Sequence, residues 1–408
     1  MRKQLIKVAH LNYALNGGAG AVAQTLCAEV DKTYFDSKIF TIVENSILEI
    51  GIRDPLHFIS GAIDRILVSK TSISFNLLKK SFNSKLISEL KRFNPDIIHF
   101  HGVHGMFNEE KFVSLFNRVP LVWTLHDMTP FTGGCTFSGS CTNYISKCIK
   151  CPQANLVFKG KISASQNKKI DFSNQLNLKK VIAPSRWIYD AALKSSVLKN
   201  KALTLIENPI HSSSLQVQPS DSSFLKGLSK NKINVIIMSF NLNDRRKGNV
   251  ELLNQLDCLV SSYPWLLDFK FILVGKGSVP RLKELDHELI GFIGVEDEKN
   301  ALLQHADIII SNSYGDNAPL TVLQAIRNGC LPILRKGSGH DELVNNAIDG
   351  YLYNDYDDLV KFLFEIRNDR DRLKKFNKTV LSNLKFRDSF RNNILSYENA
   401  YKEVLSFE

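Results

Sequence analysis

Short runs of apolar and β-branched residues recur along the chain and alternate with segments of helical periodicity. The runs are continuous, which is typical of strands that are covered on both faces and not of a half-exposed sheet. The predicted strands are Leu5–Asn12, Lys38–Val43, Asp96–His101, Leu121–His126, Val181–Pro184, Asn234–Phe240, Phe269–Gly275, Ile290–Gly294, Asp307–Asn312 and Leu331–Leu334.

Amphipathic segments lie between these strands. Their apolar residues recur every three or four positions, as in Ser84–Phe93, Val250–Ser261, Leu320–Asn328 and Asp357–Arg367. Strands that alternate with such helices predict an α/β protein made of βαβ units and parallel sheets. The 408 residues exceed what one hydrophobic core usually supports, so two doubly wound, Rossmann-like domains are expected.

A stretch rich in Ser and Pro separates the two halves of the chain. It predicts an N-terminal domain over 1–208, a linker over 209–232 and a C-terminal domain over 233–385. Residues 386–408 are helical in pattern, and we expect them to pack back on the N-terminal domain. The two domains are expected to face one another across a cleft. Ligands of open α/β sheets bind where the strands end, so the chemistry should lie in loops that follow strands.

The composition, 44% hydrophobic and 23% charged, is that of a soluble globular protein and excludes a disordered chain. No apolar run is long enough to cross a bilayer and no signal peptide is apparent, which predicts a cytoplasmic protein. The formal charge is +11, and residues 157–201 carry nine Lys and one Arg against two Asp. Such a segment suits an anionic surface, or is a solvated helical face. Aromatic residues do not interleave with it, so nucleic acid is not an expected partner.

A glycine-rich loop follows the first predicted strand. Gly18 and Gly20 precede the helical segment Ala21–Val30, where backbone N–H groups can approach a phosphate or a sugar. The spacing differs from that of a dinucleotide-binding fingerprint, which argues against NAD. Similar turns also occur without any ligand.

Histidines lie at the ends of two further predicted strands. His99, His101 and His104 form one group, in which we expect one histidine to line the cleft and two to be packed, because a metal site would need further ligands. His126 ends the next strand beside Asp127. It could hydrogen-bond a sugar hydroxyl or transfer a proton, or be a structural histidine of the cleft wall.

Four cysteines lie close together in a loop at 133–153: Cys135, Cys141, Cys148 and Cys151. Four thiolates suit a tetrahedral structural zinc, and the pair Cys148 and Cys151 has the spacing of a zinc half-site. Reduced thiols that pack the loop are the alternative. A catalytic cysteine is not expected.

Several short segments, in this order, resemble glycosyltransferase family 4. They are the Gly-Gly-Ala-Gly loop, Thr124–Asp127 with the Pro-Phe-Thr-Gly-Gly-Cys that follows it, Ala183–Trp187, Glu207–Ile210, Arg246–Gly248 and His305–Ala325. The likeness is strongest for bacterial members that build capsule, exopolysaccharide or O-antigen. The resemblance implies the GT-B fold, a nucleotide-sugar donor, hexosyl transfer with retention of configuration and no catalytic metal.

The resemblance also implies a donor site in the second half. Lys247 matches the family's diphosphate-binding Lys, and Arg246 or Arg245 replaces its Arg. Asp316 and Gln324 occupy the two Glu positions of the family's Glu-x7-Glu element, so that Gln324 would receive the ribose hydroxyls without the charge of a carboxylate. The residues between them that are predicted to contact the donor are Asn317, Ala318, Pro319, Leu320 and Thr321. His126, Lys247 and Asp316 are the predicted catalytic residues.

These residues predict a retaining glycosyltransferase that moves a sugar from UDP or GDP to a saccharide or lipid-linked acceptor in surface polysaccharide biosynthesis. With a lipid-linked acceptor, the basic segment 157–201 would contact the anionic inner face of the cell membrane. Two alternatives remain open at this point. One is a different GT-B enzyme, such as a nucleotide-sugar epimerase. The other is a non-catalytic basic binding protein, suggested by the basic segment 157–201 and by the departures from the family pattern at Asp316 and Gln324.

Overall fold

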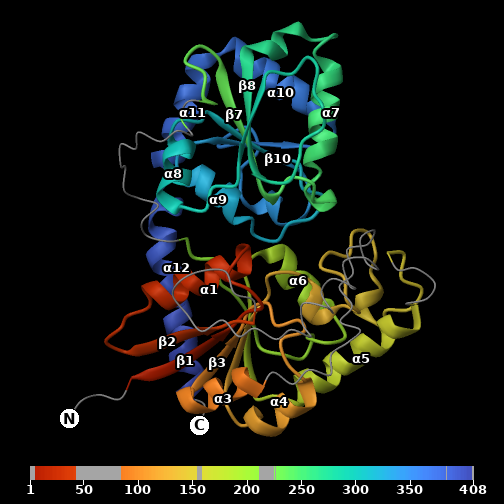
Figure 1. Ribbon diagram of the computed structural model, residues 1–408, viewed down its shortest axis with the longest axis vertical. Coiled ribbons are helices and arrows are strands. Elements are labelled where there is room, and N and C mark those ends of the chain that lie inside the picture. Colours follow the sequence, from red (N-terminus) through yellow and green to blue (C-terminus); the bar gives the residue numbers. More distant parts are fainter. Residues whose placement is uncertain are drawn as a thin grey trace. The chain divides into compact units, whose positions relative to one another are not determined.

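The computed structural model describes residues 5–42, 84–153, 159–210, 225, 227–382 and 384–406. The chain divides into two compact units (Figure 1). Unit 1 comprises residues 1–209 and 391–408, and unit 2 comprises residues 210–390. Most of the predicted linker, 209–232, lies outside the described residues.

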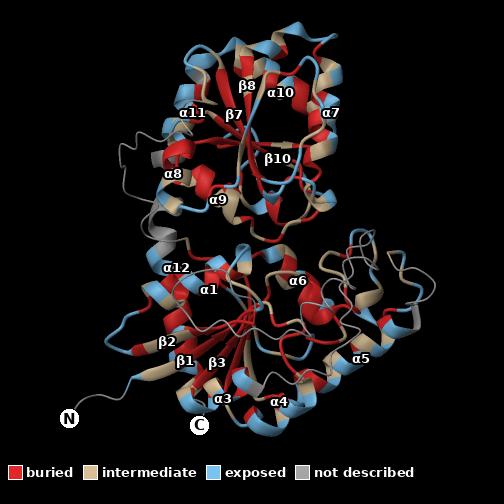
Figure 2. Ribbon diagram, in the orientation of Figure 1, coloured by how far each residue is buried: buried red, intermediate tan, exposed pale blue. Residues whose placement is uncertain are grey.

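Unit 1 is built around a six-stranded sheet with the strand order β2-β1-β3-β4-β5-β6, in which all neighbouring strands are parallel. The strands are β1 (Ile6–Leu11), β2 (Phe35–Phe40), β3 (Ile97–Phe100), β4 (Leu121–Thr124), β5 (Leu178–Ala183) and β6 (Leu203–Leu205). The connecting helices are α1 (Gly18–Glu29), α3 (Ser84–Phe93), α4 (Glu109–Phe116), α5 (Lys159–Gln175) and α6 (Arg186–Lys194). Every residue of the central strands β3 and β4 is buried (Figure 2).

The last helix, α12 (Leu384–Ser406), joins unit 1 from residue 391 onward. Its Tyr397 and Tyr401 are fully buried there. The Glu398 carboxylate accepts a hydrogen bond of 2.8 Å from the backbone N–H of Asp31, just after α1. The end of the chain is therefore part of the core of unit 1.

Unit 2 contains a second six-stranded parallel sheet, with the strand order β12-β11-β10-β7-β8-β9. The strands are β7 (Ile233–Asn241), β8 (Phe269–Lys276), β9 (His287–Gly291), β10 (Ile308–Ser311), β11 (Leu331–Arg335) and β12 (Tyr351–Tyr353). The helices are α7 (Asn249–Leu259), α8 (Glu296–Gln304), α9 (Leu320–Arg327), α10 (Tyr356–Asn368) and α11 (Arg370–Ser382).

Helices cover both faces of this sheet. On β7, Val235 and Ile237 belong to one apolar cluster and Ile236 belongs to the other, because successive side chains of a strand point to opposite faces. A strand covered on both faces must be apolar at every position, which explains the continuous runs in the sequence.

The predicted α/β architecture of two parallel sheets is confirmed. The strands that the sequence did not predict are β6 and β12, each of only three residues at an edge of its sheet. Within the described residues, none of the helices has both the length and the apolar character needed to cross a bilayer.

Candidate functional site

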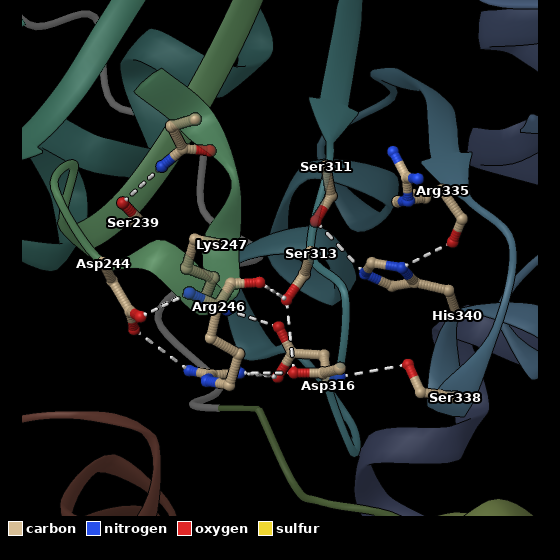
Figure 3. Close-up of polar contacts among 12 residues, drawn as sticks. Ser239, Asp244, Arg246, Lys247, Ser311, Ser313, Asp316, Arg335, Ser338 and His340 are labelled. Carbon is tan, nitrogen blue, oxygen red and sulfur yellow. Dashed lines mark hydrogen bonds and ion pairs between the residues drawn. The ribbon is translucent and has the colours of Figure 1, made fainter. Parts of the chain in front are cut away.

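The loops that follow β7, β10 and β11 bring together the charged residues predicted in the second half of the chain (Figure 3). These strands are neighbours in the sheet, so their carboxyl ends lie at one edge. Arg246 and Lys247 occupy a 3₁₀ turn between β7 and α7, and Asp316 follows β10. Arg245, in the same turn, is exposed.

Asp316 pairs with both cations. Its Oδ2 binds the ammonium group of Lys247, and its Oδ1 lies 3.4 Å from Nη1 of Arg246. Nη1 also donates a hydrogen bond of 2.6 Å to the carbonyl of Gly315. Burial acts to raise the pKa of Asp316, but Lys247 and Arg246 outweigh it and hold this pKa well below its usual range. Asp316 is therefore ionised, and it fixes the positions of two cations.

The turn that carries the cations depends on the residues at its two ends. The Asp244 carboxylate caps it by accepting a hydrogen bond of 2.9 Å from the backbone N–H of Arg246. Gly248 ends it with φ 62°, in the left-handed region. A Cβ atom there would also lie 2.7 Å from the side chain of Asn312. Only glycine combines this backbone conformation with that close approach.

The loops after β10 and β11 are joined by backbone contacts. The N–H of Asp316 donates to the Ser338 hydroxyl at 3.0 Å, and the N–H of Gly339 donates to the Asp316 carbonyl at 2.8 Å. A Cβ atom on Gly339 would lie 1.4 Å from the carbonyl oxygen of Asn317, so no larger residue fits. These contacts hold the Asp316 carboxylate in place.

His340, which the sequence analysis did not single out, is buried beside this loop. Its Nδ1 donates a hydrogen bond of 2.9 Å to the carbonyl of Arg335, and its Nε2 lies 3.1 Å from the Ser311 hydroxyl. Burial lowers its pKa even though Asp316 acts in the opposite direction. The imidazole is therefore neutral.

The predicted donor segment continues from this loop into α9. Pro319 precedes the first turn of α9, where unpaired backbone N–H groups favour an anion. Asn317 and Pro319 are buried, whereas the remaining members of the segment are partly exposed: Ala318, Leu320 and Thr321.

Gln324 lies one turn further along α9 and contacts a carboxylate of α8. Its side-chain amide donates a hydrogen bond of 2.5 Å to Oε1 of Glu296, and Lys299 pairs with Oε2 of Glu296 at 2.6 Å. The sequence analysis missed Glu296, because an acidic first turn is an ordinary feature of a helix. Position 324 has no carboxylate of its own, but one lies within hydrogen-bond distance of it.

In unit 1, the two predicted glycines have different environments. Gly18, the first residue of α1, is exposed, and a Cβ atom there would meet nothing within 4 Å. Gly20 is buried, and a Cβ atom there would lie 2.1 Å from the carbonyl oxygen of Leu15. Gly20 therefore permits close packing of the loop on α1, and Gly18 leaves the start of α1 open.

His126 follows β4 and ends a row of hydrogen-bonded histidines. Its Nε2 lies 3.0 Å from Nδ1 of His101, and Nε2 of His101 lies 3.1 Å from Nδ1 of His10. Burial lowers the pKa of His10 and of His126 to about 3, and lowers that of His101 as well. All three rings are therefore neutral near pH 7.

The sequence analysis missed His10, which is the second-last residue of β1. Residue 10 is paired with His99 in the register of β1 and β3, and this pairing was not available from the sequence alone. His99 itself contacts the hydroxyls of Thr124 and Tyr401, at 2.7 Å each. Asp127 accepts a hydrogen bond of 2.7 Å from the backbone N–H of Thr129.

The four loop cysteines line one small cavity together with Tyr144 and Ile162, and none forms a disulfide: Cys135, Cys141, Cys148 and Cys151. Tetrahedral zinc with Zn–S bonds of 2.3 Å needs sulfur atoms about 3.8 Å apart. Among the described residues, no three of these sulfur atoms lie within 4.8 Å of one another. Burial raises the pKa of the Cys135 thiol to about 11. The structure therefore does not support the structural zinc, and it favours protonated thiols that pack the loop.

Part of the basic segment 157–201 is engaged within unit 1. The Lys169 ammonium group donates hydrogen bonds to the carbonyls of Thr129 and Thr132, at 2.5 and 2.9 Å. Lys180 pairs with Glu403 of α12. Because these contacts hold two of the lysines within unit 1, the segment presents less positive charge to solvent.

Two parallel-sheet, Rossmann-like domains define the GT-B class of glycosyltransferase folds, and solved structures share this architecture. HepE of Anabaena, crystallised with UDP and glucose, superposes with a TM-score of 0.66 at 16% identity, covering 99% of this chain and 100% of that chain. Sucrose-phosphate synthase of Thermosynechococcus elongatus gives a TM-score of 0.63 at 15% identity, with 99% and 100% coverage.

Family comparisons identify the chain more closely. Residues 16–214 match the model of Glycosyltransferase Family 4, and residues 233–369 match that of Glycosyl transferases group 1. The chain therefore consists of a Glycosyltransferase Family 4 domain followed by a Glycosyl transferases group 1 domain, and it is a glycosyltransferase.

Two curated relatives match part of the chain. The chain is 24% identical over 319 residues to alpha-monoglucosyldiacylglycerol synthase of Acholeplasma laidlawii, which covers 73% of each protein. It is 27% identical over 270 residues to the putative colanic acid biosynthesis glycosyl transferase WcaC of Escherichia coli K12, which covers 62% of this chain and 63% of that protein.

Proposed function

We propose that this glycosyltransferase moves a sugar from UDP or GDP to a saccharide or lipid-linked acceptor, with retention of configuration, in the synthesis of a surface polysaccharide or glycolipid. The observation that carries the proposal is the pair of fixed cations, Arg246 and Lys247, held by Asp316 at the carboxyl edge of the sheet in unit 2. A solved structural neighbour contains UDP and glucose, which supports a nucleotide-sugar donor.

The cations match the charge that develops during transfer. As the glycosidic bond breaks, the departing diphosphate gains negative charge, and preorganised cations stabilise it. In the proposed reaction the acceptor hydroxyl attacks the anomeric carbon on the face from which the diphosphate leaves. The proton of that hydroxyl passes to a departing phosphate oxygen. Backbone N–H groups at the start of α9, near Ala318 and Thr321, bind the diphosphate or the donor sugar.

The carboxylate that receives the ribose hydroxyls is assigned to Glu296. The family pattern has a Glu at position 324, and here Gln324 donates a hydrogen bond to Glu296 instead. The Glu296 carboxylate thereby gains a fixed orientation, and each of its oxygens retains a lone pair for a hydroxyl. In this proposal the carboxylate is supplied by α8 and positioned by α9.

Unit 1 contributes His126 and the open start of α1 at Gly18 to the proposed function. His126 contacts the sugar that is transferred, and it is not a nucleophile. The relatives named for a glycolipid and for colanic acid support a lipid-linked or saccharide acceptor. A lipid-linked acceptor would bring the exposed lysines of 157–201 to an anionic membrane surface.

Ligand binding and turnover test the proposal together. The purified protein is titrated with a panel of UDP- and GDP-sugars while its thermal stability is followed. A ligand at 100 times its dissociation constant stabilises the fold by about 2.7 kcal/mol. With the donor so identified, we expect Lys247→Ala to lower kcat by about 10²- to 10³-fold, as for loss of one group that stabilises the transition state.

Arg245→Ala is the matched control, because Arg245 lies in the same turn but is exposed. We expect it to retain nearly full activity. Equal losses in Lys247→Ala and Arg245→Ala would contradict the assigned site. Conversion of the donor sugar without any acceptor would instead indicate a nucleotide-sugar epimerase.

A further inference from the structure

A row of three hydrogen-bonded imidazoles leads from the interior of unit 1 to His126. The row begins at His10, which is fully buried, passes through His101, which is 2% exposed, and ends at the half-buried His126. Its two hydrogen bonds join Nδ1 of His10 to Nε2 of His101, and Nδ1 of His101 to Nε2 of His126.

These hydrogen bonds couple the tautomers of the three rings. A neutral imidazole has one N–H and one acceptor nitrogen, so His101 must donate to one neighbour and accept from the other. Only two arrangements of a neutral row satisfy both hydrogen bonds. In one, every ring carries its proton on Nδ1; in the other, every ring carries it on Nε2.

The buried end of the row distinguishes the two arrangements. Nε2 of His10 is inaccessible to solvent, and within the described part of the chain it has no hydrogen-bond partner. The Nε2–H arrangement would place an N–H there without an acceptor, whereas the Nδ1–H arrangement leaves only a lone pair. Orphaned buried N–H groups are rarer in proteins than acceptors without a donor.

The other end of the row is accessible. Among the described residues, Nδ1 of His126 has no hydrogen-bond partner. Unlike Nε2 of His10, this atom is accessible to solvent. It is therefore the polar atom that this row presents at the surface of unit 1. We infer that His10 and His101 are positioning residues that fix His126 as the Nδ1–H tautomer, so that it donates a hydrogen bond to a substrate oxygen.

The buried end of the row, at His10, also limits the proton transfers that the row can carry out. A proton taken up at His126 and passed inward would make His10 a buried imidazolium with an N–H that lacks an acceptor. Burial and nearby Lys32 both oppose this charge by lowering the pKa of His10. His126 accordingly acts as a neutral donor and not as a general base.

A metal ion does not explain the cluster equally well. His10, His99 and His101 place one ring nitrogen each within 4.8 Å of one another. Both ring nitrogens of His99 are engaged with hydroxyls, of Thr124 and Tyr401, and those of His101 are engaged with the two other histidines of the row. A metal would have to displace several of these contacts.

The direct test needs no substrate. Long-range proton–nitrogen correlation spectra of the full chain, labelled with ¹⁵N-histidine, report which ring nitrogen is protonated. We expect Nδ1–H at His10, His101 and His126 near pH 7.5, although free histidine in water favours Nε2–H. Loss of one signal in His126→Gln assigns that ring. An Nε2–H tautomer at His126 would overturn the inference.

A variant at the far end of the row then tests its effect on turnover. His10→Leu removes the donor to His101 without touching His126. We expect His126 to lose its single tautomer and kcat to fall about tenfold with the donor KM within twofold, as when the partner that orients a functional histidine is removed. The matched control is Thr124→Val, which removes a partner of His99 and leaves the row intact; its tautomers and kcat should be unchanged.

That the oxygen bound by His126 belongs to a sugar rests on the proposed function, but the tautomer does not. An Nδ1–H tautomer in a protein that transfers no sugar would leave the tautomer assignment standing and refute the function. An Nε2–H tautomer in an active transferase would refute the tautomer assignment and leave the function standing. An unchanged kcat in a folded His10→Leu variant would refute the positioning role.

Discussion

In both units the candidate functional side chains follow strands of a parallel sheet, but those of unit 1 are neutral and those of unit 2 are charged. In unit 1 the groups that follow β3 and β4 are neutral histidines such as His101 and His126. In unit 2 the groups that follow β7 and β10 are ions, with Lys247 paired to Asp316. The parallel sheet determines where a site forms, and the local residues determine its charge.

This difference matches the two parts of the proposed donor. A diphosphate needs cations, and cations stay ionised in a partly buried loop only when a carboxylate such as Asp316 accompanies them. A neutral imidazole can donate a hydrogen bond to a sugar hydroxyl, and burial keeps the imidazoles of unit 1 neutral.

The largest expected difference between the units is the loss of folding stability in mild acid. His10, His99 and His101 are neutral when folded, and burial lowers the pKa of each. Unfolded histidine has a pKa near 6.5, so the unfolded chain binds more protons between that pH and the lower folded pKa. Their contribution to stability is present above about pH 6.5 and is lost as the pH falls.

For groups that stay neutral in the folded chain, linkage gives a loss of about 5 kcal/mol for the three histidines together between pH 6.5 and 5. In unit 2 burial lowers the pKa of His340 alone among the buried histidines described. Denaturant unfolding of Trp265→Phe, followed by the fluorescence of Trp123 and Trp187 in unit 1, measures the effect. A change in the free energy of unfolding below about 1 kcal/mol would contradict it.

Asp316→Asn should have a large effect on the charged site of unit 2. The amide cannot neutralise two cations, so Arg246 and Lys247 lose the contact that fixes them before the donor binds. We expect kcat/KM to fall about 10²-fold, the lower end of the range for a preorganised electrostatic group. Asp371→Asn, on the surface of α11, should leave it unchanged. A loss below about threefold would show that Asp316 does not position the cations.

Glu296→Gln tests the proposed ribose contact. The amide keeps the shape of the side chain but removes the charge that strengthens hydrogen bonds to hydroxyls. Because this contact forms equally in the ground state and the transition state, we expect the donor KM to rise about tenfold with kcat nearly constant. Asp297→Asn, the exposed neighbour in the same turn, is the control. A fall in kcat with unchanged KM would place Glu296 elsewhere in the mechanism.

The sequence revealed those parts of the sites that lie in loops after strands. Lys247 and Asp316 were predicted from the resemblance to glycosyltransferase family 4, and His126 also from its position at the end of an apolar run. The two sheets were predictable because apolar runs mark their strands. The edge strands Leu203–Leu205 and Tyr351–Tyr353 were not, because three residues are too few to show a period.

What the sequence could not reveal were contacts between elements distant in the chain. His10 becomes part of a site only through its register with β3, and Glu296 only because α8 packs beside α9. The cysteines show the opposite case. Their spacing suited zinc, but spacing does not determine where sulfur atoms point, and among the described residues no three of the four sulfur atoms lie within 4.8 Å of one another.

Restoring the family residue at position 324 gives the smallest expected effect and the sharpest test of the assignment to α8. In Gln324→Glu the new carboxylate would lie at the place from which the amide now donates to Glu296, at 2.5 Å. Two carboxylates so close cannot both remain ionised, and one takes up a proton. We expect kcat/KM to fall about threefold rather than rise, and to recover partly as the pH is lowered from 8 to 6.

The double variant Glu296→Gln/Gln324→Glu exchanges the carboxylate and the amide between the two helices. It should return kcat/KM to within about threefold of the original, so that the two changes are strongly non-additive in a double-mutant cycle. If Gln324→Glu alone raised kcat/KM, Glu296 could not be the carboxylate that serves the ribose. The carboxylate for the ribose would then belong to α9, as in the family pattern, together with the backbone N–H groups at the start of that helix.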